Sequence, residues 1–382
     1  MHILCQQKDF QHAVNSVYRA VANQSTIPIL TGILLHASDG KVFLEATDME
    51  LRIRYGFNTQ VMKEGKAVVP AKYFVDLVKR LPDEQIELGL DESGERLYMK
   101  YGDSIVKLNL FEVEEFPEDE GEPLEYGLSV DPLLFSESIR QVSIAVAKDE
   151  TRPVFTGVYM ELKDEHLLHM AATDSHRLTL KKVNVTINQG EKGEKDEPFG
   201  EVIVPSRALN EVARLMGEAE EEIKIGFSES RVGFQCGDIV IQSQLIDGQY
   251  PNFKDVIPDS FKTLVEVDTN LFYDSLSRAS LVSYGEYKGK GIVRINIEGN
   301  HINIFSFSSD VGEVRETLPL FTMEGKDLEI AFDARYLLEV LRVLNTERAR
   351  IEFTGPLSPA VIKPTEGNSY LYLALPIRIQ GQ

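Results

Sequence analysis

The feature of this sequence that most constrains its fold is an internal repeat of about one third of the chain. Residues 28–32 (PILTG) return at 153–157 (PVFTG), and residues 46–48 (ATD) return at 172–174. Phe10 and Asp48 stand 38 positions apart, and so do Phe272 and Asp310 in the last third. Self-similarity at a fixed period is the signature of tandem structural units. The sequence therefore predicts three copies of one unit.

A second block of similarity indicates where the units join. Residues 69–74 (VPAKYF) match 204–209 (VPSRAL) and 332–337 (FDARYL). The larger shift in the second unit predicts a loop insertion in the Gly-rich, charged residues 188–200. A chain of 382 residues also exceeds what one hydrophobic core usually supports. We expect domains at residues 1–127, 128–256 and 257–382, with the acidic residues 112–125 as the first linker and residues 257–260 at the second join.

Each unit shows the same order of predicted elements. An amphipathic helix comes first, at residues 10–21, 132–147 and 270–282. Strand patterns follow, and Asp39-Gly40 between two of them is a strong hairpin turn. A second helix then begins at Pro70, Pro205 or Asp333, with apolar residues every three or four positions. The predicted fold class is α+β, with two helices on one face of antiparallel sheets in each domain.

Charge and cysteine content exclude several classes of protein. The chain has 40 Lys and Arg against 61 Asp and Glu, a net charge of −21, so any contact with nucleic acid must be local. Two cysteines, Cys5 and Cys236, are too few for a disulfide framework or a metal cage, and we expect both to be buried and reduced. We predict no metal and no cofactor. Because no segment has the pattern of a signal peptide or a membrane span, we expect a cytoplasmic protein with no membrane partner.

Within this acidic chain, the second helices carry basic residues in one register. The two positions of each pair are seven residues apart, almost two helical turns, so both cations lie on one side of their helix. The pairs are Lys72 and Lys79, Arg207 and Arg214, and Arg335 and Arg342, with Arg80 and Lys148 nearby. If these helices face a common interior, the cations form a lining that binds phosphates without reading bases, which permits sliding.

Ion pairing on the helix surface is an alternative explanation for these cations. Asp76, Glu211 and Glu339 each stand four residues after the first cation of a pair. Such a pair stabilises a helix by only about 0.3–0.5 kcal/mol. Considered alone, the helix sequences leave both explanations open.

Motifs of all three units together indicate a family. They are PILTG (28–32), ATD (46–48), RP (152–153), ATDSHRL (172–178), YP (250–251), IP (257–258) and LPIRI (375–379). This set closely resembles the bacterial DNA polymerase III beta subunit, the family of beta sliding clamps. The resemblance implies a processivity factor: a homodimer whose six domains form a ring around duplex DNA of any sequence, with helices lining the hole.

The resemblance also implies which residues join the two chains. An arc of three domains has exposed sheet edges at its ends, and joining the first domain of one chain to the third of another covers both. Val106 and Leu108 on one side and Leu281 and Val282 on the other align with the family's contact. Each of them alone also fits an ordinary core position.

By the same resemblance, DNA polymerase, clamp-loader subunits and repair factors bind through short, partly hydrophobic peptides in a pocket between the second and third domains. Apolar residues there supply burial, and His and Arg orient the peptide. The expected wall consists of Phe155, Thr173, His176, Arg177, Leu178, Pro251, Val256, Leu375, Pro376, Ile377 and Arg378.

The chain departs from the family at a few positions. Gln24 and Asp149 stand where well-studied relatives have residues that contact DNA, and we expect Lys148 and Arg152 to substitute for them. The tail, residues 380–382, extends past the family's usual end.

Two other functions compete with this one. Asp174, Ser175 and His176 are the residue types of a hydrolytic triad, but neighbours on a strand point in alternating directions, and the sequence has no oxyanion, Walker or metal motif. We therefore expect no enzymatic activity and no catalytic residue. The second alternative is a protein-only repeat scaffold that does not encircle DNA.

Overall fold

The computed structural model describes residues 1–119, 122–164, 166–188, 200–283 and 291–378. The predicted loop insertion falls largely on residues 189–199, and the tail on residues 380–382, both outside the described residues. The chain forms two compact units: unit 1 is Met1–Ser136, Val185–Pro198 and Arg207–Leu245, and unit 2 is Glu137–Asn184, Phe199–Ser206 and Ile246–Gln382. The middle third of the sequence therefore contributes strands to both units.

Unit 1 contains two antiparallel sheets. The five-stranded sheet has the order β5 (Gln60–Lys63), β1 (His2–Gln6), β7 (Gln85–Leu90), β8 (Arg96–Tyr101), β9 (Ser104–Asn109). The nine-stranded sheet has the order β14 (Thr186–Ile187), β10 (Glu125–Val130), β16 (Ile223–Phe227), β17 (Arg231–Cys236), β18 (Ile239–Gln244), β4 (Leu51–Asn58), β3 (Lys41–Thr47), β2 (Gly32–Ser38), β6 (Gly65–Pro70). Pairing of β18 with β4 makes one sheet from the first and middle thirds of the sequence.

Unit 2 repeats this plan with its own two antiparallel sheets. The nine-stranded sheet has the order β15 (Glu201–Pro205), β11 (Gly157–Asp164), β12 (Leu167–Thr173), β13 (Arg177–Asn184), β27 (Tyr370–Ala374), β26 (Ala360–Pro364), β25 (Arg348–Phe353), β19 (Thr263–Asp268), β23 (Thr322–Gly325). The four-stranded sheet has the order β22 (Gly312–Pro319), β21 (His301–Ser308), β20 (Ile292–Glu298), β24 (Leu328–Asp333). Here β13 and β27 join the middle and last thirds.

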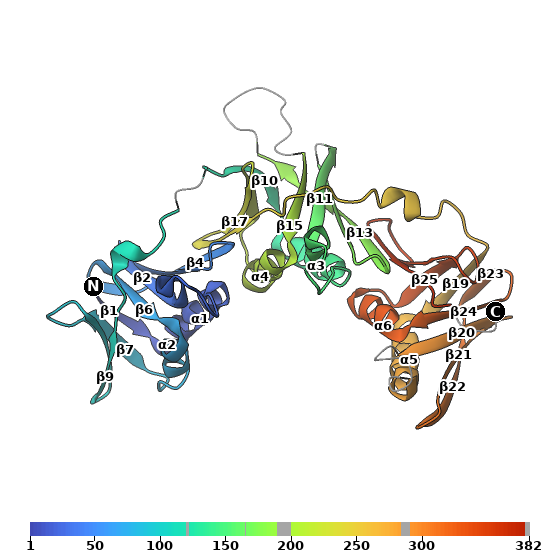
Figure 1. The fold of residues 1–382 in the computed structure, drawn as a ribbon, viewed down its shortest axis with the longest axis horizontal. Helices are drawn as coiled ribbons and strands as arrows, with labels where there is room; N and C mark the ends of the chain where they lie inside the picture. Colours follow the sequence, from blue (N-terminus) through green and yellow to red (C-terminus); the bar gives the residue numbers. More distant parts are fainter. Residues whose placement is uncertain (120–121, 165, 189–199, 284–290, 379–382) are drawn as a thin grey trace. The chain divides into compact units, whose positions relative to one another are not determined.

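The helices occur in the predicted places. They are α1 (Gln7–Val17), α2 (Ala71–Val78), α3 (Pro132–Ser143), α4 (Ser206–Met216), α5 (Thr269–Ser283) and α6 (Ala334–Val343). Figure 1 shows α1 beside α2 and α5 beside α6, and each of these pairs is in contact. Helix α3 ends four residues before the predicted end at 147, because the chain tightens into turns in which the Ala145 and Val146 amides donate to Val142 and Ser143.

The second helices begin where the sequence predicts. Helix α2 follows Pro70 and α4 follows Pro205, and the buried Asp333 caps α6 by accepting a hydrogen bond from the Arg335 amide. The apolar stripes of these helices enter the cores: Phe74 packs edge-on against Phe10 at 5.8 Å between ring centroids in unit 1. In unit 2, the corresponding Leu337 belongs to a buried cluster around Phe272.

The repeat is visible as one turn built twice. The Asp48 turn (residues 47–51) joins β3 to β4 in unit 1, and the Asp174 turn (residues 173–177) joins β12 to β13 in unit 2. The Thr47 and Thr173 hydroxyls accept hydrogen bonds from Met49 and Ser175, and the Asp48 and Asp174 carboxylates accept from the two amides that follow. Met49 and Ser175 both have positive φ, 78° and 73°. The shared ATD motif thus encodes a shared backbone.

Short 3-10 helices complete the described elements. They are η1 (Tyr18–Ala20), η2 (Pro28–Thr31), η3 (Val113–Glu115), η4 (Pro153–Thr156) and η5 (Lys254–Val256). Helices η2 and η4 are the two repeated Pro-x-x-Thr motifs, and in both the Thr hydroxyl donates to the Pro carbonyl, at 2.7 and 2.8 Å. Cys5 and Cys236 are free and buried as predicted.

Candidate functional site

The cations of α2 are exposed and lie next to no acidic partner on their own helix. Lys72, Lys79 and Arg80 are all exposed, and among the described residues no ion pair joins Lys72 to Asp76. The Lys72 ammonium instead lies 5.4 Å from the ring centroid of Tyr73, which is 70% exposed. Ion pairing with Asp76 therefore does not account for the basic residues of this helix.

The cations of α4 have structural partners within unit 1. Arg207 forms an ion pair with Asp48 at 2.5 Å and donates to the Arg19 carbonyl at 2.7 Å. Arg214 pairs with Glu211 at 2.6 Å and donates to the Ser16 carbonyl. The proposed pair between Arg207 and Glu211 is replaced by these contacts, which hold α4 against the first third of the chain.

The cations of α6 differ again. Arg335 pairs with Asp333 at 2.7 Å, and the exposed Arg342 donates to the Tyr273 hydroxyl at 2.8 Å. Glu339 forms an ion pair with Arg177, on β13. The acidic residue between the cations thus contacts the Asp174 turn.

Lys148 and Arg152 lie in the exposed loop after α3. The Arg152 guanidinium lies 5.8 Å from the ring centroid of Phe155, a residue of the predicted peptide site. The structure therefore places Arg152 beside that site, while Lys148 stays exposed. Gln24 and Asp149, the departures from the family, are exposed as well.

The predicted peptide site is organised around the Asp174 turn and the end of β27. The Leu375 amide donates to the His176 carbonyl at 2.9 Å, and Leu178 is paired with Leu373 across the two strands. The Thr173 amide donates to the Tyr250 hydroxyl at 3.0 Å, which brings the 250–256 segment to the same place. Three segments distant in sequence therefore meet at this turn.

Beneath them lies a small hydrophobic cluster. Leu178, Phe253 and Tyr159 are buried there, with Tyr250 packed against them. The Phe155 ring meets Tyr250 edge-on at 6.1 Å. Burial raises the pKa of Tyr250 above its ordinary value, so the hydroxyl stays protonated.

The other predicted residues form the exposed rim. Val256 is 52% exposed and Leu375 38%, while Pro376 and Ile377 are half-buried. Pro251 and Arg378 are exposed. Buried aromatic rings with exposed aliphatic side chains around them suit a partly hydrophobic peptide.

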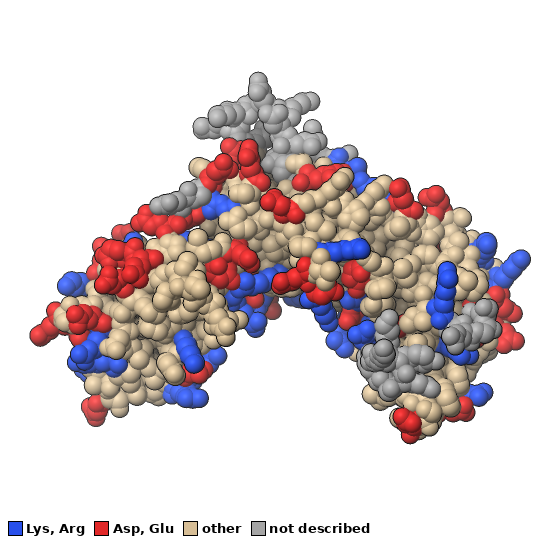
Figure 2. Space-filling view, viewed as in Figure 1, with Lys and Arg blue, Asp and Glu red and all other residues tan. Residues whose placement is uncertain are grey.

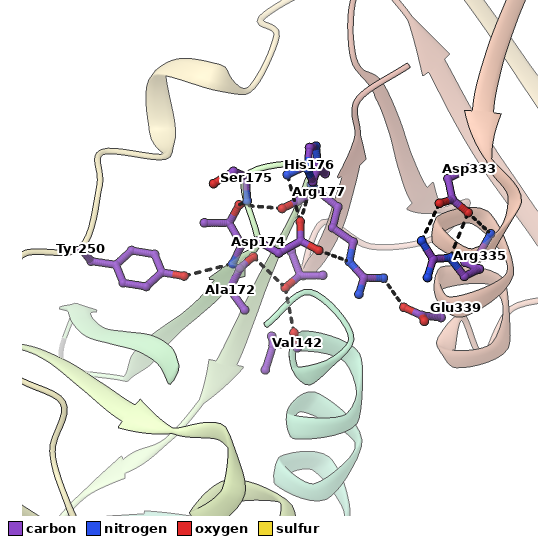
Figure 3. A network of polar contacts seen from close by, with 12 residues as sticks. Val142, Ala172, Asp174, Ser175, His176, Arg177, Tyr250, Asp333, Arg335 and Glu339 are labelled. Atoms are coloured by element: carbon purple, nitrogen blue, oxygen red, sulfur yellow. Dashed lines mark hydrogen bonds and ion pairs between the residues drawn. The ribbon is translucent and has the colours of Figure 1, made fainter. Parts of the chain in front are cut away.

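Arg177 differs from the other predicted residues, because it is only 5% exposed. Its guanidinium pairs with Asp174 at 3.0 Å and with Glu339 (Figure 3). It also lies 4.7 Å from the ring centroid of Tyr336. Burial opposes its charge, but the neighbouring Tyr372 and Glu339 raise the pKa of Arg177 above its ordinary value. The guanidinium is thus occupied within the chain, and its direct contact with a peptide stays a prediction.

Sequence reasoning did not assign a role to several residues around this site. Tyr250 precedes the predicted Pro251, and its place in a Tyr-Pro motif was a usable signal. Tyr336 stacks nearly parallel to His176, at 6.4 Å and 19°, and nothing in the sequence points to that contact. The contact joins the Asp174 turn to α6, which follows it in the sequence by about 160 residues.

The candidate dimer residues lie at the margin of each unit. Val106 and Leu108 are half-buried on β9, an edge strand, next to Ile105, which is 56% exposed. Near the end of α5, Leu281 is 74% exposed and Val282 is half-buried. Exposed apolar side chains and unpaired strand edges are expected where another chain binds.

Comparison with known proteins identifies the family. Models of the N-terminal, central and C-terminal domains of the DNA polymerase III beta subunit match residues 1–119, 129–252 and 254–378. The beta sliding clamp of Halalkalibacterium halodurans is 33% identical over 99% of this chain and 100% of its own. The chain belongs to the DNA polymerase III beta subunit family.

Solved structures agree with this assignment. The DNA polymerase sliding clamp of Bacillus subtilis has a TM-score of 0.89 and 29% identity, with 99% of both chains covered. A Pseudomonas aeruginosa sliding clamp bound to griselimycin has a TM-score of 0.89 and 25% identity, covering 99% of this chain and 100% of its own. Family membership confirms the predicted fold class and the predicted processivity function over a protein-only scaffold, and the family is not enzymatic.

The structure also limits other kinds of site. Among the described residues, no group of three or more His, Cys, Asp or Glu is placed to hold a metal ion. Helices in the same part of the chain are all too short or too polar to span a membrane.

Proposed function

We propose that two copies of this chain close head to tail into a ring around duplex DNA and tether DNA polymerase and clamp-loader subunits there. Membership of the beta sliding clamp family is the observation that carries the proposal. The three domains extend over residues 1–127, 128–256 and 257–382, and the matched family segments support this division. The protein acts in the cytoplasm, where bacterial DNA is.

The DNA contact is made by the basic positions of the second helices and the loop after α3. Lys72, Lys79, Arg80 and Lys148 are exposed, which leaves their charges available to phosphate. Figure 2 shows Lys and Arg among many Asp and Glu on the visible face, so the net charge of −21 still permits local basic surface. Arg207, Arg214, Arg335 and Arg342 combine this role with the structural contacts described above.

Reversing the exposed charges of α2 tests the DNA contact. We expect K72E/K79E/R80E to weaken duplex binding and to flatten its salt dependence, because each lost phosphate contact reduces the slope of log K against log salt by about 0.9. Fluorescence anisotropy across a salt series measures both. K224E/K262E/K326E changes the net charge equally at exposed lysines outside the second helices and is the matched control. Equal slopes in the two variants would contradict the proposed lining.

Encirclement itself needs a topological test. A loaded ring stays on nicked circular DNA and leaves linear DNA through its ends, whereas an adhesive scaffold treats both alike. The ring also requires two chains of 43.0 kDa. Light scattering at micromolar concentration should give the dimer mass, and I105D/L281D should give the monomer; a monomeric wild-type protein would overturn the proposal.

The Asp174 turn and the rim around it form the peptide site. We expect V256S/L375S to weaken a fluorescein-labelled clamp-binding peptide of a bacterial replicative polymerase by about tenfold or more, since both side chains are exposed apolar anchors. Met62 is as exposed as Val256 but lies in unit 1, so M62S is the control. Griselimycin should displace the peptide if the ligand of the Pseudomonas aeruginosa clamp uses the same site.

A further inference from the structure

Arg177 is the only buried residue of the predicted peptide site with a full charge, and two carboxylates hold it. Asp174 belongs to the same turn, while Glu339 comes from α6, 162 residues later. A buried charge is tolerated only when it is paired, and removing one partner is strongly unfavourable. The turn is therefore fixed partly from a helix outside the site.

Glu339 itself does not belong to the predicted wall of the site. Its side chain is 33% exposed, and it stands on α6 between Arg335 and Arg342. Figure 3 shows its carboxylate directed to Arg177, while the neighbouring Arg335 is paired with Asp333. Glu339 thus links a helix with candidate DNA contacts to the turn with candidate peptide contacts.

The corresponding acidic residue of unit 1 has no such function. Glu211 occupies the same helix position, but it pairs with Arg214 and Arg19. The Asp48 turn has Leu51 where the Asp174 turn has Arg177, so it offers no cation to an acidic helix residue. The two units therefore link helix and turn with opposite polarity: in unit 1 the Arg207 cation of α4 pairs with Asp48 of the turn, whereas in unit 2 the Glu339 carboxylate of α6 pairs with Arg177 of the turn.

We propose that Glu339 is a positioning residue for the peptide site: by holding Arg177, it fixes the Asp174 turn in the conformation that binds a partner peptide. This inference rests on the proposed function. The turn presents Thr173 and His176 beside Leu178, the next residue of β13, and the His176 carbonyl accepts a hydrogen bond from the Leu375 amide. When the Glu339 charge is lost, the Arg177 side chain is no longer held by α6 and can turn toward solvent. Thr173, His176 and Leu178 then no longer keep the relative positions that bind the peptide.

The test compares the changes in peptide affinity and in DNA affinity caused by one substitution. Glu339→Gln should bind the labelled polymerase peptide about tenfold more weakly, a loss typical of one broken charge contact. The same variant should bind duplex DNA as well as or better than wild type, because α6 loses a negative charge. A general loss of folding would weaken both. Hydrogen exchange should rise in residues 173–178 and not in α6.

A matched control and a double variant complete the design. Asp76→Asn removes one charge at the repeat-equivalent, exposed position of α2 and should leave peptide binding unchanged. Because Glu339 acts through Arg177, R177Q/E339Q should bind peptide no more weakly than Arg177→Gln alone. Additive losses would overturn the inference, as would equal peptide binding by Glu339→Gln and wild type. If wild type itself binds no peptide, the proposed peptide site fails as well.

Discussion

The Asp48 turn and the Asp174 turn have the same backbone and opposite surroundings. Both use a Thr hydroxyl, an Asp carboxylate and one residue with positive φ, and both continue into a strand paired with a strand of the next repeat. Even one long-range bond is repeated: the Gln244 amide donates to Glu50 at 2.9 Å, as Leu375 does to His176. The repeat therefore preserves the backbone of the turn and its strand pairing, on which a ligand site can form.

The side chains around each turn then determine which kind of ligand can bind there. A cleft of about 440 Å³ beside the Asp48 turn is lined by charged residues, among them Arg52, Asp119 and Arg231. Arg52 stands where unit 2 has Leu178, and it donates to the Pro117 carbonyl. Arg231 pairs with Asp119 at 2.6 Å. The arginines of unit 1 thus hold its own acidic linker.

The corresponding segment of unit 2 is held by aromatic packing. Tyr250 and Phe253 pack on Tyr159, at 5.3 and 5.6 Å between ring centroids. That packing leaves an apolar surface with Leu178 at its base. The same position of the repeat is thus occupied by Arg52 in unit 1, which makes a polar contact within the chain, and by Leu178 in unit 2, where the surface suits an apolar partner.

The largest expected difference between the turns concerns their arginines. Arg177→Gln leaves Asp174 and Glu339 without their cation and should lower local stability by about 3 kcal/mol. Arg207→Gln breaks a pair whose arginine side chain is 48% exposed and should cost less than about 1 kcal/mol. Hydrogen exchange of amides 171–180 and 45–54 reports each turn separately. Equal costs would show that burial does not distinguish the two pairs.

The next effect concerns the shared carboxylates. Asp48→Ala and Asp174→Ala each remove two hydrogen bonds from backbone amides, a loss of about 1–2 kcal/mol, and each also takes a partner from an arginine. Asp174→Ala should cost more because Arg177 is buried, whereas the Arg207 side chain is 48% exposed. The Asn variants retain one acceptor oxygen and are the controls. Thermal unfolding gives the ranking, and a larger loss at Asp48 would contradict it.

Much of this arrangement was readable from the sequence because it is local. The ATD motifs, the Asp39-Gly40 hairpin and the starts of the second helices at Pro70, Pro205 and Asp333 depend on residues within one turn of the chain. The internal repeat extended these local predictions to the order of elements. Fold class followed from both.

The ion-pair partners of the charged residues could not be predicted from the sequence, because they depend on which segments meet in the folded chain. The spacing of Asp76, Glu211 and Glu339 suggested three equal ion pairs, and Glu211 and Glu339 instead contact Arg214 and Arg177. Sequence spacing predicts on which side of a helix a charged residue lies. Which carboxylate pairs with a buried cation depends on the tertiary contacts that bury that cation.

Low pH should affect the first linker, residues 112–125, but not the 250–256 segment. Burial opposes the charge of Asp119, but hydrogen bonds from Gln242 and Arg231 hold its pKa below the ordinary value. Its ionised form therefore stabilises the folded state above the unfolded pKa, and this stabilisation is lost as pH falls through the lower folded pKa. The loss should be below about 1 kcal/mol after screening by solvent.

Proteolysis of the first linker by an acid protease should therefore rise below pH 4, the ordinary range of an Asp carboxyl. The 250–256 segment, held by aromatic rings, should not change in step. Asp119→Asn should already show the raised cleavage at neutral pH when the assay uses a protease that is active there. Parallel pH dependence of both segments would contradict the polar and apolar contrast between the units.

The smallest effect tests whether the two turns share their backbone strain. Met49 and Ser175 are exposed residues with positive φ, a conformation that costs a residue with a side chain about 1 kcal/mol and glycine almost nothing. Glycine also gains freedom in the unfolded chain, which offsets part of the relief. Met49→Gly and Ser175→Gly should therefore each stabilise the protein by about 0.5 kcal/mol. Glu50→Gly and His176→Gly, one residue later and without positive φ, should destabilise it. Unequal responses at 49 and 175 in denaturant unfolding would mean that the side-chain surroundings, and not the repeated backbone, determine the strain.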